Sequence, residues 1–258
     1  MCIRDSAKTV HAHSPGLAKR ESALTLSRMV HFTLFGIPVY IRPSFWVVLA
    51  IFGGALSISS VEDLIYPALF VIAGFIAILS HEMGHALVGR KLGGGQQTIV
   101  LELFGGLTSS HGMQLTRGGR ALMILAGPMM TLLLGIISLW LTWNIIAPVM
   151  TSYNLNFWDL AISPFTAALI SPKLYILSCL IMIGEWWTIL NLLPIYPLDG
   201  GQLIAQYIRS PRKVFMTGFI TAILIGLLSF QLFHGYFIPI FMAPVSYTHL
   251  TLHKNAPF

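Results

Sequence analysis

Charged side chains are scarce in this sequence, since aspartate, glutamate, lysine and arginine together make up only 9% of its 258 residues. An ordinary soluble domain carries about 25% charged residues. Hydrophobic residues account for 55% of the chain, and its mean hydropathy is +0.78. The shortage of charge excludes a water-exposed globular domain and predicts an integral membrane protein embedded in the lipid bilayer.

Cysteine is also scarce, and no leader of the secretory type is recognisable. The chain has two cysteines, Cys2 and Cys179, which are too few for a disulfide framework. Residues 1–29 lack the apolar middle of a secretory signal peptide, so we predict no cleaved signal. The net charge of +6 indicates no nucleic-acid partner, because basic residues beside membrane segments mostly determine topology.

Long apolar runs are what the sequence has instead of charge. A helix of about twenty apolar residues spans a bilayer. We therefore predict an all-α polytopic membrane protein with about six transmembrane helices, the last of them truncated. Five spans are predicted at residues 41–57, 64–89, 121–149, 174–193 and 214–233, and a sixth begins after His234.

Basic residues are concentrated in alternate connections between these spans. They precede the first span, follow the second up to Arg120, and follow the fourth up to Lys213, whereas the other connections hold few or none. The positive-inside rule then places the N-terminus and the segments 90–120 and 200–213 in the cytoplasm. We expect a protein of a prokaryotic cytoplasmic membrane.

The segment after the second span differs from its neighbours. QQTIVLELFGGLTSSHGMQL, within residues 93–120, has β-branched residues, near-alternation and a Gly-Gly pair, which is typical of a hairpin. It is too apolar for a free cytoplasmic loop, so we predict a re-entrant β-hairpin that the protein shields from lipid. The alternative is a surface loop with some apolar residues.

Two histidines and a glutamate interrupt the second span in the stretch HEMGH. His81 and His85 are four residues apart and therefore lie on one face of a helix. This is the H-E-x-x-H arrangement, in which both histidines bind zinc and Glu82 acts as general base. The alternative is a pair of histidines hydrogen-bonded within a helix bundle, but ionisable groups inside a membrane are functional by default.

Catalytic zinc has three protein ligands and one open position, so a third ligand is needed. The candidates are His111, Glu102, Glu185, Asp199 and His234. Asp199 lies in NLLPIYPLDGG, where prolines and glycines prevent a regular helix, and the topology places it at the depth of the histidines. The alternative role for Asp199 is the N-cap of a helix that begins at Gln202. We assign Glu185 to no metal.

These motifs occur in a characteristic order. HEMGH lies in a span, FGG in the following loop, AGP opens the next span, and N-x-x-P-x-x-P-x-D-G follows the fourth span. Together, over roughly residues 31–240, they resemble the site-2 protease family, peptidase family M50, in a compact form without a PDZ domain. The resemblance implies an intramembrane zinc metalloendopeptidase that cleaves a single-pass membrane-protein substrate in or near its transmembrane helix.

Residue by residue, the resemblance makes His81, His85 and Asp199 the ligands of one Zn²⁺ ion and Glu82 the catalytic base and acid. It further implies that Asn191 stabilises the oxyanion or positions substrate, and that Pro197 shapes the turn. Phe104, Gly105 and Gly106 would form a loop that controls substrate access. The family often has an asparagine shortly after AGP, where this chain has Met129, Met130 and Thr131.

The domain organisation follows from the same resemblance. We expect a cytoplasmic N-terminal segment over residues 1–30, a metalloprotease domain over residues 31–245, and a non-native tail over residues 246–258. MCIRDS and VSYTHLTLHKNAPF, at the two ends, look like translated adapter or assembly scars. Two other functions remain open, a divalent-metal transporter and a catalytically inactive membrane scaffold.

Overall fold

The computed structural model describes residues 30–233, apart from residues 104, 113, 154–162 and 209. The predicted N-terminal segment, the sixth span and the tail therefore lie outside the described residues, except for Val30. The order of elements is β1 (Val30–Leu34), β2 (Ile37–Ile41), α2 (Pro43–Phe52), η1 (Ala55–Ser57), η2 (Glu62–Leu64), α3 (Ile65–Gly93), β3 (Gln96–Glu102), β4 (Gly105–His111), α4 (Arg117–Tyr153), α6 (Pro164–Ala168), α7 (Pro172–Leu192), α8 (Asp199–Ala205) and α9 (Pro211–Phe233).

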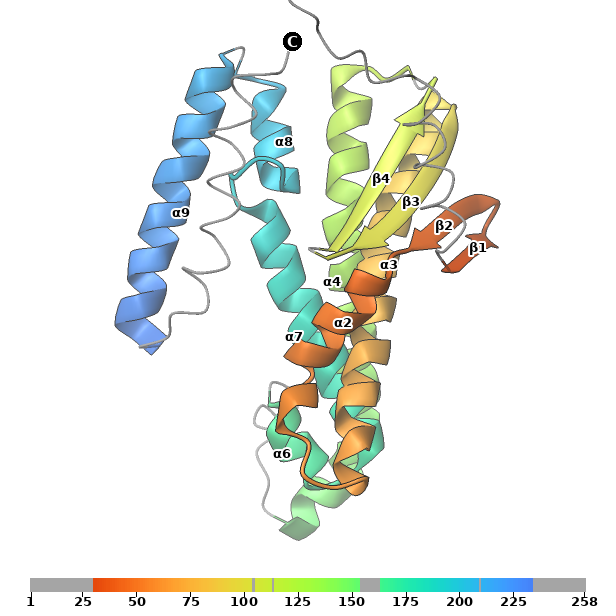
Figure 1. The fold of residues 1–258 in the computed structure, drawn as a ribbon, viewed down its shortest axis with the longest axis vertical. Coiled ribbons are helices and arrows are strands. Elements are labelled where there is room, and N and C mark those ends of the chain that lie inside the picture. Colours follow the sequence, from red (N-terminus) through yellow and green to blue (C-terminus); the bar gives the residue numbers. More distant parts are fainter. Residues whose placement is uncertain (1–29, 104, 113, 154–162, 209, 234–258) are drawn as a thin grey trace, which may run out of the picture.

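Helices α3, α4 and α7 pack against one another as the central bundle, with the sheet on one side and α8 and α9 on the other (Figure 1). Within the described residues, three helices are long and apolar enough to cross a membrane, over Glu62–Gly93, Arg117–Ile145 and Pro172–Leu192. They correspond to the second, third and fourth predicted spans. The fifth predicted span is helical as α9, and its crossing of the membrane remains a prediction.

The first predicted span, at residues 41–57, is wrong as a spanning helix. Its α-helical part is α2, which has ten residues and ends at Phe52. At 1.5 Å per residue such a helix is about 15 Å long, half of what a bilayer requires. Proline at its start and the glycine pair after Phe52 limit it to this length.

A four-stranded sheet in the order β1-β2-β3-β4 accompanies the helices, so the prediction of an all-α protein holds only for the bundle. The predicted hairpin is confirmed as β3 and β4, which pair antiparallel from Gln96–His111 to Glu102–Gly105. β2 joins it in parallel, with Val39 beside Ile99. The membrane re-entry of the hairpin remains a prediction.

The β1–β2 hairpin was missed from the sequence. Its two-residue turn, Phe35-Gly36, has positive φ at both positions, as a tight hairpin turn requires. Phenylalanine is an unusual residue there, and the turn therefore gave no signal. Ile37, Val39 and Ile41 alternate inward and bury their side chains against Ile99 and Leu101 and against α3.

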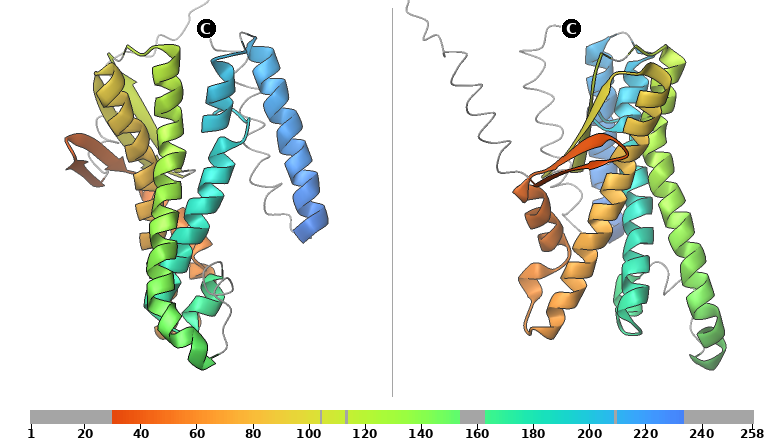
Figure 2. Two further views of the ribbon diagram at one scale, coloured as in Figure 1. Left: turned by 180° about the vertical axis from the view of Figure 1, so that it is seen from behind. Right: turned by 90° about the vertical axis from the view of Figure 1, so that its right-hand side faces the viewer.

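The direction of the helices brings distant segments to one end of the bundle. α3 and α7 run in one direction and α4 runs in the other (Figure 2). The sheet, the start of α4 and the turn before α8 therefore lie at the same end (Figures 1 and 2). This arrangement agrees with the prediction that segments 90–120 and 200–213 share one membrane face.

Candidate metal centre

The two histidines of HEMGH lie side by side on the buried face of α3. Four helical steps return a side chain to nearly the same direction, and the ring centroids of His81 and His85 are 4.7 Å apart. The two Nε2 atoms are separated by 3.1 Å. His81 is 2% exposed and His85 is 8% exposed, so both imidazoles are withdrawn from lipid and from water.

Asp199 completes the group from the start of α8. Its carboxylate Oδ2 lies 3.0 Å from Nε2 of His81 and 3.3 Å from Nε2 of His85. α7 ends at Leu192, and the prolines that follow carry the chain through an irregular turn into α8. At Gly200 a Cβ atom would lie 2.5 Å from the carbonyl oxygen of Leu193, so only glycine lets α8 fold back this closely on the end of α7.

The N-cap alternative for Asp199 is wrong for the helix that this chain forms. Asp199 is the first residue of α8, and the N-cap position belongs to Leu198. The side chain of Asp199 is turned toward the histidines of α3. Its location at a helix N-terminus nonetheless favours the ionised carboxylate, because the helix dipole is positive at that end.

Three ligand atoms at these distances fit a zinc ion. Tetrahedral zinc with bonds of about 2.0–2.1 Å separates its ligand atoms by about 3.3 Å, and the three sides of the triangle here measure 3.0, 3.1 and 3.3 Å. Asp199 Oδ2 is buried and accepts no well-formed hydrogen bond within the described residues. His81, His85 and Asp199 form the one cluster of three or more potential metal ligands in the part of the chain that the structure describes.

A main-chain carbonyl orients the second histidine. Nδ1 of His85 lies 2.8 Å from the carbonyl oxygen of Met123 in α4, so Nδ1 carries the proton and Nε2 presents its lone pair to the metal position. Nδ1 of His81 is buried and has no hydrogen-bond partner among the described residues. The sequence could not identify Met123 as this partner, because every residue has a main-chain carbonyl.

Glu82 lies next to the first histidine without joining the cluster of ligands. Its carboxylate is buried, and Oε2 accepts a hydrogen bond of 2.7 Å from Oγ1 of Thr108 in β4. At Gly106, two residues earlier in β4, a Cβ atom would lie 2.6 Å from Oε1 of Glu82. The Gly-Gly pair therefore leaves room for the carboxylate between α3 and the sheet.

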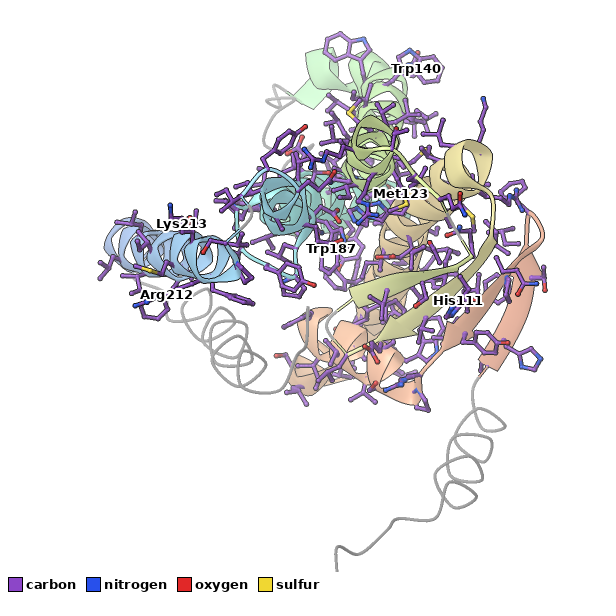
Figure 3. All side chains as sticks on the ribbon, turned by 90° about the horizontal axis from the view of Figure 1, so that it is seen from above. His111, Met123, Trp140, Trp187, Arg212 and Lys213 are labelled. Carbon is purple, nitrogen blue, oxygen red and sulfur yellow. The ribbon has the colours of Figure 1, made fainter. Side chains whose placement is uncertain are left out.

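The two glycines of FGG face opposite sides of β4, as adjacent residues of a strand must. A Cβ atom at Gly105 would lie 2.6 Å from Cζ2 of Trp187 in α7, whereas Gly106 faces Glu82. Viewed from above, Trp187 lies in the interior between α7 and the sheet (Figure 3). Phe104 lies outside the described residues, and a role in substrate access remains a prediction for all three.

Asn191 and Pro197 do not contact the ligands in the hydrogen bonds of the described residues. Nδ2 of Asn191 donates to the carbonyl of Trp187 one helical turn earlier, at 2.9 Å. The carbonyl of Pro197 accepts a hydrogen bond of 2.9 Å from Nε2 of Gln202, which ties the turn to α8. Their predicted roles in oxyanion binding and turn shaping remain predictions.

The remaining candidates for the third ligand lie elsewhere. Glu102 forms an ion pair with Arg42 at 3.0 Å, and Glu185 is on the exposed face of α7. His111 is exposed at the end of β4, over the sheet (Figure 3), and His234 lies outside the described residues. Asp199 is the one candidate that the described fold brings to the histidines.

The AGP triplet positions α4 against the site. A Cβ atom at Gly127 would lie 2.8 Å from Cδ2 of His85. Further along α4, the hydroxyls of Thr131 and Thr188 are 2.8 Å apart, and they lie 3.0 and 3.3 Å from the carbonyl oxygen of Pro128. These buried hydroxyls join α4 to α7 shortly after the AGP triplet, in the manner of polar contacts between membrane helices.

We expect the substitution Gly127→Ala to weaken zinc binding by roughly 10- to 100-fold, the range typical for residues that orient metal ligands. The added methyl group must displace the imidazole of His85. Competition with a zinc chelator on purified protein in detergent measures the affinity. Gly135→Ala on the same helix is the control, since nothing lies within 4 Å of its Cβ position. Equal zinc affinity of the two variants would contradict this account.

Comparisons with known proteins agree with the geometry. The model of peptidase family M50 matches residues 69–233. A zinc metalloprotease of Methanocaldococcus jannaschii is 28% identical over 174 residues, covering 67% of this chain and 43% of that protein. A protein of Synechocystis sp., provisionally named a zinc metalloprotease, is 28% identical over 188 residues, with coverages of 68% and 43%. This chain thus spans less than half the length of these two relatives.

A solved structure has the same fold. The site-2 protease from Methanocaldococcus jannaschii superimposes with a TM-score of 0.56 at 23% sequence identity, and the match covers 89% of this chain and 97% of that one. At this identity the likeness concerns the fold alone. With the family model matching more than half of its residues and the His-His-Asp cluster assembled at the expected positions, the chain belongs to peptidase family M50, the site-2 protease family of zinc metalloproteases.

Proposed function

We propose that this chain is an intramembrane zinc metalloendopeptidase that hydrolyses a peptide bond in or near the transmembrane helix of a single-pass membrane protein. The observation that carries the proposal is the buried triangle of His81, His85 and Asp199 with Glu82 beside it. These residues match the zinc-protease pattern in identity and spacing, and they lie among helices long enough to cross a membrane.

The three ligands hold the metal ion, and the glutamate transfers the proton. A zinc ion, when bound, supplies a Lewis acid that polarises the substrate carbonyl and makes water acidic enough to react near neutral pH. His81, His85 and Asp199 hold it, and the hydrogen bond from His85 to Met123 maintains the orientation of that ring. The burial of all three residues keeps competing water away from the ligand atoms.

Glu82 moves the proton. Oε2 is occupied by Thr108, whereas Oε1 has no hydrogen-bond partner among the described residues, so Oε1 is the atom that accepts a proton from the attacking water. As the C–O bond forms and the C–N bond breaks, the same carboxyl returns that proton to the leaving amine. In this proposal Asn191 turns its amide from Trp187 toward the oxyanion, which a hydrogen-bond donor stabilises.

Substrate must reach this site in an extended form, because a helix keeps its carbonyls in its own hydrogen bonds. β4 is at the edge of the sheet and runs past Glu82 through the hydrogen bond from Thr108. We propose that the unwound substrate pairs with this edge as an added strand. Phe104, Gly105 and Gly106 would then control its approach.

The proposed location is the cytoplasmic membrane, with the N-terminus and the active-site end on the cytoplasmic side. The distribution of basic residues supports this orientation. The end of α3, the start of α4 and the start of α9 lie at the same end of the molecule as the sheet (Figure 1), and these helix ends carry Arg90, Lys91, Arg117, Arg120, Arg212 and Lys213. Residues 31–245 form the proposed protease domain.

A divalent-metal transporter, the alternative function, has less support. An ion path requires ligands toward both faces of the membrane, whereas the described residues gather all three at one depth. A scaffold without activity has no need of Glu82 beside the ligands. Both alternatives remain outcomes of the following experiment.

Purified protein reconstituted in vesicles with a fluorescent single-span reporter tests the proposal. We expect cleavage of the reporter within or beside its transmembrane helix, loss of cleavage with a zinc chelator, and recovery when zinc is added back. The reporter fragments are identified by mass spectrometry. Zinc uptake into the vesicles without reporter cleavage would support the transporter, and the absence of both activities would support the scaffold.

A further inference from the structure

The hydroxyl of Thr108 has contacts that neither the sequence motifs nor the family pattern quoted above assigns. Oγ1 lies 2.7 Å from Oε2 of Glu82 and 3.1 Å from the main-chain carbonyl oxygen of the same residue. Both acceptors belong to one residue, on a helix 26 positions earlier in the sequence. The hydroxyl has a single proton, and the shorter distance assigns it to the carboxylate, while the carbonyl contact keeps the hydroxyl close to the backbone of α3.

The position of Thr108 on β4 explains why it reaches the carboxylate. Residues two apart on a strand face the same side, so Gly106 and Thr108 both face α3. The place that a side chain at position 106 would fill is taken by Cγ, Cδ and Oε1 of Glu82, and Thr108 donates to Oε2. The strand thus distinguishes the two oxygens of the carboxylate, because Oε2 accepts a hydrogen bond and Oε1 accepts none among the described residues.

The strand that carries Thr108 is itself held firmly. β4 pairs with β3 along its full length, with Thr108 beside Ile99. Ile99 is fully buried in the core formed by the sheet, α2 and α3. Ser110, the next residue on the same face, donates to Oε1 of the buried Gln97 at 2.5 Å. The backbone at Thr108 is therefore held in place by the sheet, independently of the rotamer of Glu82.

We propose that Thr108 is a positioning residue for the proposed proteolytic reaction, which holds Glu82 by Oε2 so that Oε1 faces the reacting water. This inference rests on the proposed function. A glutamate side chain has three rotatable bonds, and without a partner its carboxylate samples several rotamers. A charge-assisted hydrogen bond from a rigid strand selects one of them.

The test compares two substitutions at the same position. Thr108→Val keeps the β-branched shape and removes the donor, so we expect kcat to fall by roughly 10- to 100-fold, as expected from the loss of one hydrogen bond to a charged group. KM and zinc content should remain unchanged, because the side chain of Thr108 contacts Glu82 and not the metal ligands, and the substitution leaves the main chain at the free edge of β4 as it is. Thr108→Ser retains the hydroxyl and should keep kcat within about threefold of the parent chain.

Thr217→Val is the matched control, because it makes the same chemical change in α9, where the hydroxyl donates to the carbonyl of Lys213 in its own helix. A second readout does not need catalysis. The infrared carboxylate band of Glu82, identified by subtracting the spectrum of Glu82→Gln, should shift in Thr108→Val and remain in place in Thr108→Ser and Thr217→Val.

The outcomes separate this inference from the proposed function. If the parent chain cleaves the reporter and Thr108→Val retains kcat with an unshifted carboxylate band, the positioning role is wrong and the protease proposal stands. If the parent chain shows no chelator-sensitive cleavage, the protease proposal fails, and with it the role of Thr108 in that reaction, whatever the infrared band shows. A lower kcat with a shifted band and full rescue by serine would support the role.

Discussion

Glu82→Gln is expected to reduce cleavage of a single-span reporter by about 10²- to 10⁴-fold, the usual contribution of a positioned general base. The amide that replaces the carboxylate has nearly the same shape but cannot accept the proton of the attacking water. Because Glu82 is not among the three ligands, zinc content and folding should not change. The measurement is the initial rate of reporter cleavage in vesicles at saturating zinc.

Glu62→Gln serves as the control for Glu82→Gln, since Glu62 is an exposed residue in the short turn before α3. It makes the same chemical change far from the site, and its rate should equal that of the parent chain. Substantial cleavage by Glu82→Gln at normal zinc content would mean that another group serves as the base.

Asp199→Asn is expected to lower zinc affinity by more than about 100-fold, because residues that merely orient ligands already contribute 10- to 100-fold. The change removes the negative charge that faces both imidazoles at 3.0 and 3.3 Å. It leaves two neutral nitrogens 3.1 Å apart, which together provide too few ligands for tetrahedral zinc. Proteolysis should be lost in parallel and should return partly at high zinc concentration.

Zinc per protein after dialysis against a graded chelator series measures this effect. Asp63→Asn is the control, because Asp63 is exposed and accepts hydrogen bonds from the backbone of Ser59 and Ser60, in the turn before α3. It should bind zinc as the parent chain does. Full zinc retention by Asp199→Asn would exclude Asp199 as a ligand and leave the histidine pair without a third partner in the described residues.

Much of the helical architecture was predictable because it depends on local properties of the sequence. Runs of about twenty apolar residues predict spanning helices from composition and length alone, and α3, α4 and α7 formed where such runs occur. The hairpin at β3 and β4 was signalled by alternation around a Gly-Gly pair. The failure at residues 41–57 came from reading an apolar stretch as one helix, although Ile41 is the last residue of β2 and the helix extends only from Pro43 to Phe52.

The individual site residues were predictable to different degrees. His81 and His85 face the same side because a helix repeats every 3.6 residues, so their spacing was sufficient. Asp199 was proposed from its depth and its broken backbone, but its distance from the histidines depends on the turn between α7 and α8. Thr108 had one usable signal, its place two residues after Gly106 on the same strand face, which becomes meaningful only when Glu82 is known to lie opposite.

The sequence alone therefore determined that this chain belongs in a membrane, that α3, α4 and α7 form long apolar helices, and that two histidines and a glutamate lie within five consecutive residues of α3. The tertiary structure decided which distant acid completes the metal site, which carbonyl orients His85 and which hydroxyl holds Glu82. The physical reason is the distance along the chain over which each kind of interaction acts. Helix periodicity and hydropathy act within a few residues, whereas the 3.0 Å approach of Asp199 to His81 joins positions 118 residues apart and depends on the packing of α3, α4, α7 and the sheet together.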